Sequence, residues 1–124
     1  MENLIIESTN YTPKVEFKRN GDLLLEGKSC PVNVTRFYYP IILWVEGLKA
    51  KRVKFDIDLE YINSASVKNL LEILKSLEAN RHIKEININW HYEEGDDDAL
   101  ETGQILEELS QRIRFIFHEY SEAA

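Results

Sequence analysis

The middle of the chain alternates between apolar and polar residues with a period of two. Between residues 51 and 62 apolar side chains occupy every second position, at Val53, Phe55, Ile57, Leu59 and Tyr61. Because successive side chains of a strand point to opposite faces, this pattern predicts a strand with one buried face and one polar face. Residues 86–92 repeat the alternation and predict a second strand of the same kind.

A spacing of three and four residues takes over after the first of these strands. Apolar residues recur in this way from 64 to 80, which predicts an amphipathic helix, and another helix is expected around 99–112. The apolar segment that ends near Ala50 contains Pro40, which lacks an N–H and clashes with the turn before it. The prediction there is a short turn to Tyr39, followed by a helix with Pro40 in its first turn.

Short apolar runs near the N-terminus predict three strands, at residues 4–7, 15–19 and 23–27. Asn20-Gly21-Asp22 between the last two is a hairpin signal, because Gly and Asn readily adopt a positive φ. The chain is therefore expected to open with a β meander. The tail at residues 114–120 fits either a final strand or a continued helix.

These elements predict an α/β fold in two layers. Central strands of a sheet that is covered on both faces are nearly all apolar, whereas the two clearest strands here each carry one polar face. Helices are therefore expected on only one face of a mixed sheet, in right-handed β-α-β crossovers. A length of 124 residues and a hydrophobic content of 44% suit one core, so residues 1–124 are expected to form a single domain.

The charge of the chain argues against two classes of partner. Lys and Arg total 15 against 22 Asp and Glu, and the net charge of −7 repels nucleic-acid backbones and anionic membrane surfaces. The sequence shows no signal peptide and no window long and apolar enough to span a bilayer, so a cytoplasmic protein is expected. Cys30 is the single cysteine and is interpreted as a structural thiol.

The acidic residues suggest solvated surfaces more than catalysis. One strand face carries Asp56, Asp58 and Glu60, and exposure to water explains these carboxylates better than a pair of catalytic acids does. The acidic run 93–98 lacks the spacing of a calcium loop. It is interpreted as a charged turn that caps the next helix.

The histidines show no metal-binding spacing. His82, His91 and His118 are expected to be isolated from one another and from Cys30, so no metal site, no cofactor and no enzymatic activity are predicted. The alternative function is that of a small-molecule-binding or catalytic domain, which would require a pocket with convergent polar groups near His91 and Asp56.

Two hydroxyl groups stand where the helix 64–80 is expected to begin, in the sequence Asn63-Ser64-Ala65-Ser66. The first N–H groups of a helix are unpaired and its dipole is positive at that end, so a hydroxyl there can carry a phosphate at little structural cost. Ordinary capping by Asn63 and Ser64 is the alternative interpretation. The chain lacks an evident set of catalytic residues, and the sequence therefore favours a regulatory switch over an enzyme.

The segment 37–48 is too apolar for a helix that packs on a single sheet. If its other residues face the sheet, Tyr39 and Leu43 fall on the outward side, one turn apart. These two side chains are expected to be covered either by the C-terminal segment of the same chain or by another protein. Constitutive dimerisation through Tyr39 and Leu43 is a third functional alternative, and both monomer and dimer stay open.

Four groups of residues carry a resemblance to a known family. They are Ser29-Cys30-Pro31-Val32-Asn33, Phe37-Tyr38 with Pro40 and Trp44, Tyr61-Ile62-Asn63-Ser64-Ala65-Ser66 with Lys68, and Trp90 with Tyr92. In this order and spacing the chain resembles the SiaC family of bacterial regulatory phosphoproteins. Members of that family are similar in fold to STAS domains, the architecture of anti-sigma factor antagonists. This chain has Cys30 and Val32 where the family pattern has Tyr and Glu, and Ser64 where Thr is common.

The resemblance implies a partner-switching function. A dedicated serine/threonine kinase would phosphorylate Ser64, with Ser66 as the reserve acceptor, and a phosphatase would remove the phosphate. The unmodified form would bind and regulate a target protein such as a diguanylate cyclase. The expected partner-binding residues are Asn63, Ser64, Ala65 and Lys68 at the start of the helix, with Tyr39 and Leu43 on the outward helix face.

Overall fold

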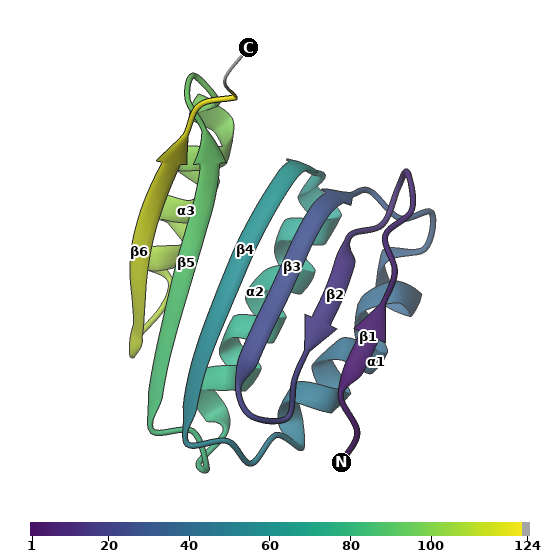
Figure 1. Ribbon diagram of the computed structural model, residues 1–124, viewed down its shortest axis with the longest axis vertical. Coiled ribbons are helices and arrows are strands. Elements are labelled where there is room, and N and C mark those ends of the chain that lie inside the picture. Colours follow the sequence, from purple (N-terminus) through teal and green to yellow (C-terminus); the bar gives the residue numbers. More distant parts are fainter. Residues whose placement is uncertain (123–124) are drawn as a thin grey trace.

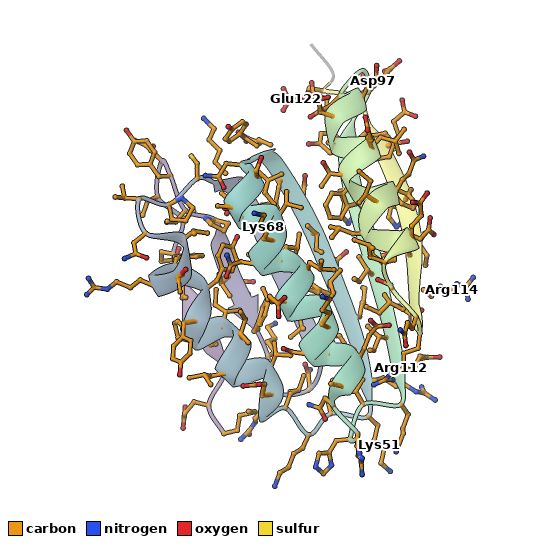
Figure 2. All side chains as sticks on the ribbon, turned by 180° about the vertical axis from the view of Figure 1, so that it is seen from behind. Lys51, Lys68, Asp97, Arg112, Arg114 and Glu122 are labelled. Atoms are coloured by element: carbon orange, nitrogen blue, oxygen red, sulfur yellow. The ribbon has the colours of Figure 1, made fainter. Side chains whose placement is uncertain are left out.

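Six strands and three helices make up the computed structural model, which describes residues 1–122 (Figure 1). The strands are β1 Leu4–Ile6, β2 Lys14–Phe17, β3 Asp22–Ser29, β4 Arg52–Ile62, β5 Glu85–Glu93 and β6 Ile113–Tyr120. The helices are α1 Val34–Glu46, α2 Ser64–Ala79 and α3 Asp97–Glu108. The strands form one sheet in chain order, and the helices lie together on one of its faces (Figures 1 and 2).

The sheet is mixed, as the sequence predicts. β1, β2 and β3 pair antiparallel and form the N-terminal meander, whereas β3 to β6 are parallel. Residues 114–120, whose conformation the sequence left open, belong to the last strand. Gly21 makes the β2–β3 turn with a φ of 103°, and a Cβ there would stand 2.0 Å from the carbonyl oxygen of Arg52, so this turn requires glycine.

The alternating pattern of the sequence decides which face of the sheet is buried. In β4 the side chains of Val53, Phe55 and Ile57 are at most 1% exposed, while the charged residues between them lie on the open face. α3 packs against β5 where Gly103 faces Trp90, since a Cβ at Gly103 would stand 2.6 Å from the indole nitrogen. None of the helices described within residues 1–122 is long and apolar enough to cross a lipid bilayer.

The prediction for the first helix is wrong at its start. α1 begins at Val34, the side chain of Asn33 caps it, and Pro40 lies inside the helix. Proline removes one N–H donor from the hydrogen-bond ladder, which weakens a helix without always ending it. Burial of Tyr38 and Ile41 under the sheet stabilises the helix across this defect.

Tyr61 departs from the alternation that places it in the core. Its side chain is 54% exposed, because a β-bulge interrupts β4 just before it. Leu59 pairs with Gly27 and Tyr61 pairs with Lys28, so Glu60 is an extra residue without a partner in β3. An extra residue shifts the alternation by one position, and the bulge thereby turns Tyr61 outward.

Arg112 fastens the end of α2 to the start of β6 (Figure 2). Its guanidinium donates hydrogen bonds of 2.9 to 3.1 Å to the carbonyl oxygens of Leu77, Glu78, Asn80 and Ile83. The last carbonyl groups of a helix have no partner inside the helix, so the guanidinium satisfies acceptors that would otherwise need water. In return, the carboxylate of Glu78 accepts the amides of Gln111 and Arg112 at 2.6 and 2.7 Å.

Replacing Arg112 with Ala is expected to lower the free energy of unfolding by about 1.5–3 kcal/mol, because the carbonyl oxygens lose a charged donor that serves several of them at once. Urea denaturation followed by circular dichroism measures this change. The matched control is Arg114→Ala, since the Arg114 side chain makes no hydrogen bond or ion pair within residues 1–122. That variant should stay within about 0.5 kcal/mol of the parent. Equal losses in both variants would contradict the role given to Arg112.

Candidate functional site

Residues 63–66 form the start of α2, here called the helix mouth, at the edge of the sheet where β3 to β6 end (Figure 1). The side chain of Asn63 accepts a hydrogen bond from the amide of Ser66 at 2.8 Å and so caps the helix. The amide of Asn63 donates to the carbonyl oxygen of Ser29 at 3.0 Å, which fastens the helix mouth to the end of β3. The amides of Ser64 and Ala65 have no acceptor among the described residues, as is usual for the first turn of a helix.

The two serines of the helix mouth have opposite environments. Ser64 is exposed, as are Ala65 and Lys68 further along the same helix. Ser66 is 0% exposed, and its hydroxyl accepts a hydrogen bond from the hydroxyl of Ser29 at 2.8 Å. The geometry therefore leaves Ser64 within reach of a modifying enzyme and encloses Ser66, the reserve acceptor of the sequence analysis.

Ser66 belongs to a chain of three buried hydroxyl groups. The hydroxyl of Ser29 donates to Ser66 and lies 2.6 Å from the hydroxyl of Tyr38, which therefore donates to Ser29. These bonds connect α1, β3 and α2 inside the core. Burial raises the pKa of Tyr38, and the hydrogen bonds of its hydroxyl oppose only part of that rise, so the side chain stays a neutral donor.

The sequence contains one signal of this hydroxyl chain, which the prediction did not use. Ser66 stands four residues before Leu70, on the same helical stripe as the apolar residues of α2. A serine on the apolar stripe of a helix has to find a hydrogen-bond partner in the core. Which partner it finds depends on how α1 and β3 pack, and a single sequence does not give that.

Three large apolar side chains are exposed at the edge that holds the helix mouth. Tyr11 is 61% exposed, Val32 is fully exposed and Tyr61 is 54% exposed. They come from the β1–β2 loop, the β3–α1 connection and the end of β4, and the amide of Cys30 joins the first two segments by donating to the carbonyl oxygen of Tyr11 at 2.8 Å. Exposed apolar groups that gather beside a polar site are typical of a protein contact surface. Tyr11 was not predicted from the sequence as part of such a surface.

Tyr39 and Leu43 lie on the outward side of α1, as the sequence predicts. They are 59% and 48% exposed. The alternative in which the C-terminal segment of the chain covers them is wrong, because that segment forms β6 at the edge of the sheet farthest from β1. Within residues 1–122, no other part of the chain shields these two side chains.

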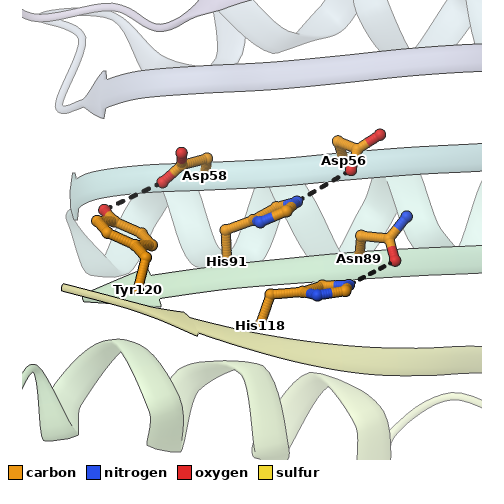
Figure 3. A network of polar contacts seen from close by, with 6 residues as sticks. All are labelled: Asp56, Asp58, Asn89, His91, His118 and Tyr120. Carbon is orange, nitrogen blue, oxygen red and sulfur yellow. Dashed lines mark hydrogen bonds and ion pairs between the residues drawn. The ribbon is translucent and has the colours of Figure 1, made fainter. Parts of the chain in front are cut away.

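The open face of the sheet carries a network of polar side chains (Figure 3). Nε2 of His91 lies 2.9 Å from a carboxylate oxygen of Asp56, and Nε2 of His118 lies 2.8 Å from the amide oxygen of Asn89. The two imidazole rings stack with their centroids 4.8 Å apart. The expectation that these histidines are isolated is therefore wrong, because the parallel register of β5 and β6 sets His91 directly beside His118.

Tyr120 extends this network from β6 to β4. Its hydroxyl donates to a carboxylate oxygen of Asp58 at 3.2 Å, across β5 (Figure 3). Desolvation, together with the negative charges of Asp58 and Glu93, raises the pKa of Tyr120 to about 12. Asp56 and His91, around which the sequence analysis placed a possible ligand pocket, bond to each other instead. Within residues 1–122, no three His, Cys, Asp or Glu side chains are grouped so that they could hold a metal ion.

Comparison with known proteins identifies the family. The family profile described as SiaC family regulatory phosphoprotein matches residues 6–120. The chain belongs to the SiaC family. It is also 30% identical over 122 residues to an uncharacterised protein of Pseudomonas aeruginosa (strain UCBPP-PA14), and that match covers 94% of each chain. The resemblance drawn from the sequence motifs is confirmed.

Solved structures of SiaC share the fold. Apo-SiaC from P. aeruginosa aligns with a TM-score of 0.83 at 28% identity, over 95% of this chain and 99% of that one. A chain in the crystal structure of the diguanylate cyclase SiaD in complex with its activator SiaC, also from P. aeruginosa, aligns with a TM-score of 0.84 at 27% identity, over 94% of this chain and 99% of that one. The two-layer fold with a mixed sheet, predicted from the sequence, is therefore the SiaC fold.

Removal of the buried Ser66 hydroxyl should destabilise this SiaC family member more than removal of the exposed Ser64 hydroxyl. Ser66→Ala is expected to lower the free energy of unfolding by about 1–3 kcal/mol, because it leaves buried hydroxyl partners unsatisfied. Ser64→Ala should change it by no more than about 0.5 kcal/mol. Denaturant titrations of the two variants measure the difference. The opposite ranking would show that the hydroxyl chain is misassigned.

The Tyr120 network should weaken at alkaline pH. A tyrosine whose pKa is raised from 10.0 to about 12 on folding contributes stability that is fully present below pH 10 and is lost as the pH rises toward 12. The gap between the melting temperatures of the parent and of Tyr120→Phe is therefore expected to narrow over that interval. Tyr38 is present in both proteins, so its own titration cancels from the comparison. A gap that stays constant would argue against the raised pKa.

Proposed function

We propose that this member of the SiaC family is a non-enzymatic regulator whose binding to a target protein is controlled by phosphorylation of Ser64. The unmodified form binds and activates a diguanylate cyclase. A serine/threonine kinase adds phosphate to Ser64, and a phosphatase removes it. The observation that carries the proposal is the exposed hydroxyl of Ser64 at the first position of α2, beside helix amides that have no acceptor. The complex of SiaD with its activator SiaC supports a cyclase as the class of target.

The helix mouth accepts added charge at little cost to the fold. Phosphorylation brings about −1.5 to −2 charges. At the N-terminus of a helix the dipole and the free amides stabilise a negative charge by roughly 0.3–1 kcal/mol, and by near 2 kcal/mol in a partly buried geometry. Lys68 stands one turn further along α2 and is exposed, so it can supply a counter-charge to the modified side chain. Folding is therefore expected to survive the modification.

In contrast to folding, binding of a partner is expected to be strongly weakened by the added charge. A protein that packs on the helix mouth removes water from it, and an uncompensated charge left in that interface costs roughly 3–5 kcal/mol. This corresponds to a loss of affinity of more than about a hundredfold. The expected contact surface consists of Asn63, Ser64, Ala65 and Lys68 with the outward pair Tyr39 and Leu43. The exposed Tyr11, Val32 and Tyr61 extend this surface along the same edge.

Mutation of the acceptor tests the proposal directly. Ser64→Ala is expected to incorporate no phosphate when the protein is incubated with its kinase, and to bind the cyclase permanently, whereas Ser64→Asp should weaken binding only in part because it carries about half the charge. Intact-mass spectrometry and a cyclase binding assay provide the readouts. The matched control is Thr35→Ala, since Thr35 is also an exposed hydroxyl residue in the first turn of an Asn-capped helix. Phosphate incorporated at unchanged stoichiometry in Ser64→Ala would refute the assignment.

The exposure of Tyr39 and Leu43 also supports a second candidate, a dimer that forms through α1 regardless of phosphorylation. Sedimentation distinguishes the two functions. A constitutive dimer would persist in Ser64→Asp and dissociate in Leu43→Glu. A partner-switching protein would bind its cyclase more weakly in Ser64→Asp, without any change in its own assembly state.

A further inference from the structure

The two halves of the sheet separate at the edge that holds the helix mouth. The ladder between β4 and β5 ends at the pair Asp58 and His91. Beyond that pair, β4 continues to Ile62 beside β3 only, while β5 continues to Glu93 beside β6 only. Figure 1 shows the two strands diverging toward their carboxyl ends. An interior strand thus presents an unpaired side over its last residues, as the edge strand of a sheet does.

A cleft of about 160 Å³ occupies this divergence on the helix side of the sheet. One wall is formed by residues 59–62 of β4, and the other by Asp96, Asp98, Ala99 and Thr102 at the start of α3. We call it the β4–α3 cleft. Leu59 and Ile62 are the apolar residues of the β4 wall. The size suits a single long side chain of another protein and is smaller than a typical small-molecule site.

The charge of the β4–α3 cleft indicates what it would accept. Glu60, Asp96 and Asp98 line the cleft, Glu60 also lines the open face beside Asp58, and within residues 1–122 none of the three forms an ion pair. Asp96 is engaged as the cap of α3, where it accepts the amide of Ala99 at 3.0 Å, and the helix dipole offsets part of the charge of both Asp96 and Asp98. Glu60 belongs to the bulge and is on no helix, so its charge is not compensated in this way. A cation is therefore favoured between Glu60 and Asp98.

The backbone of β4 is a second feature that a ligand of the cleft could recognise. Tyr61 and Ile62 have strand partners on the β3 side only, and Glu60 has no register partner on either side. Backbone groups of this kind pair readily with an extended segment of another chain. Tyr61, which is 54% exposed, also lines the cleft, and a tyrosine ring can bind a cation.

We propose that the β4–α3 cleft is a docking site for an extended segment of a partner protein that carries an arginine. The arginine stem lies on Leu59 and Ile62, its guanidinium reaches Glu60 and Asp98, and the backbone of the segment pairs with the free side of β4. Arginine suits the site because its planar group binds carboxylates and stacks on tyrosine. This inference rests on the proposed function only in that the cyclase is the expected owner of the segment.

The first test needs no partner protein. The full chain, labelled with ¹⁵N, is titrated by NMR with the capped pentapeptide Thr-Val-Arg-Val-Thr at millimolar concentration. Amide shifts are expected at residues 59–62 and at the start of α3. The affinity of the peptide, obtained from these shifts, should fall about two- to fivefold in Asp98→Asn and stay unchanged in Asp97→Asn, because Asp97 occupies the same first turn without lining the cleft (Figure 2). The peptide Thr-Val-Glu-Val-Thr should produce no such shifts.

Shifts that are absent from the cleft, or that are equal for both peptides or both variants, would overturn the proposal. A second measurement compares the affinity of the cyclase for Asp98→Asn and for Asp97→Asn. A selective loss in Asp98→Asn supports the cyclase as the owner of the segment, and equal affinities assign the segment to a different partner while the NMR titration decides the cleft itself. A cyclase that fails to bind even the parent chain counts against the proposed function and leaves the decision on the cleft with the titration.

Discussion

Parallel strands that are connected by helices on one face bring the start of every such helix to the same edge of the sheet. In this protein β3, β4 and β5 each end at that edge, and α1, α2 and α3 begin beside it. Helix starts carry unpaired amides and a positive dipole, whereas the opposite edge collects helix ends. The connectivity alone therefore concentrates anion-tolerant backbone, strand ends and exposed connections in one region. The helix mouth and the β4–α3 cleft are both consequences of this arrangement.

Within that region, burial distinguishes two chemically identical groups. Ser64 and Ser66 are two residues apart on a helix, so one faces solvent while the other faces β3. The buried hydroxyl pairs with Ser29 and through it with Tyr38, which fixes α1 and α2 against the same strand. An acceptor for phosphate has to be free of such bonds, since an enzyme must reach it. The same packing that encloses Ser66 leaves Ser64 exposed to solvent, as the proposed phosphorylation requires.

The sequence predicts the parts of this structure that follow from local periodicity. The alternation in β4, the stripe of α2 and the turn at Gly21 need no knowledge of the rest of the chain, and all three are confirmed. The prediction at Pro40 is wrong because the proline destabilises α1 by less than the burial of the helix's apolar side chains stabilises it. Tyr61 misleads because a bulge depends on the partner strand. The pairing of His91 with His118 depends on register, which no single strand encodes.

The charge of the protein constrains how a switch at Ser64 can work. The chain is already at −7, and further negative charge on Ser64 strengthens its long-range attraction for any basic segment of a partner. Release on phosphorylation therefore cannot come from long-range repulsion of such a segment. It has to come from contact, where the partner would have to desolvate the phosphate without supplying a counter-charge. Screening by salt acts over about 8 Å at physiological ionic strength, so salt should slow association without reversing the effect of the phosphate.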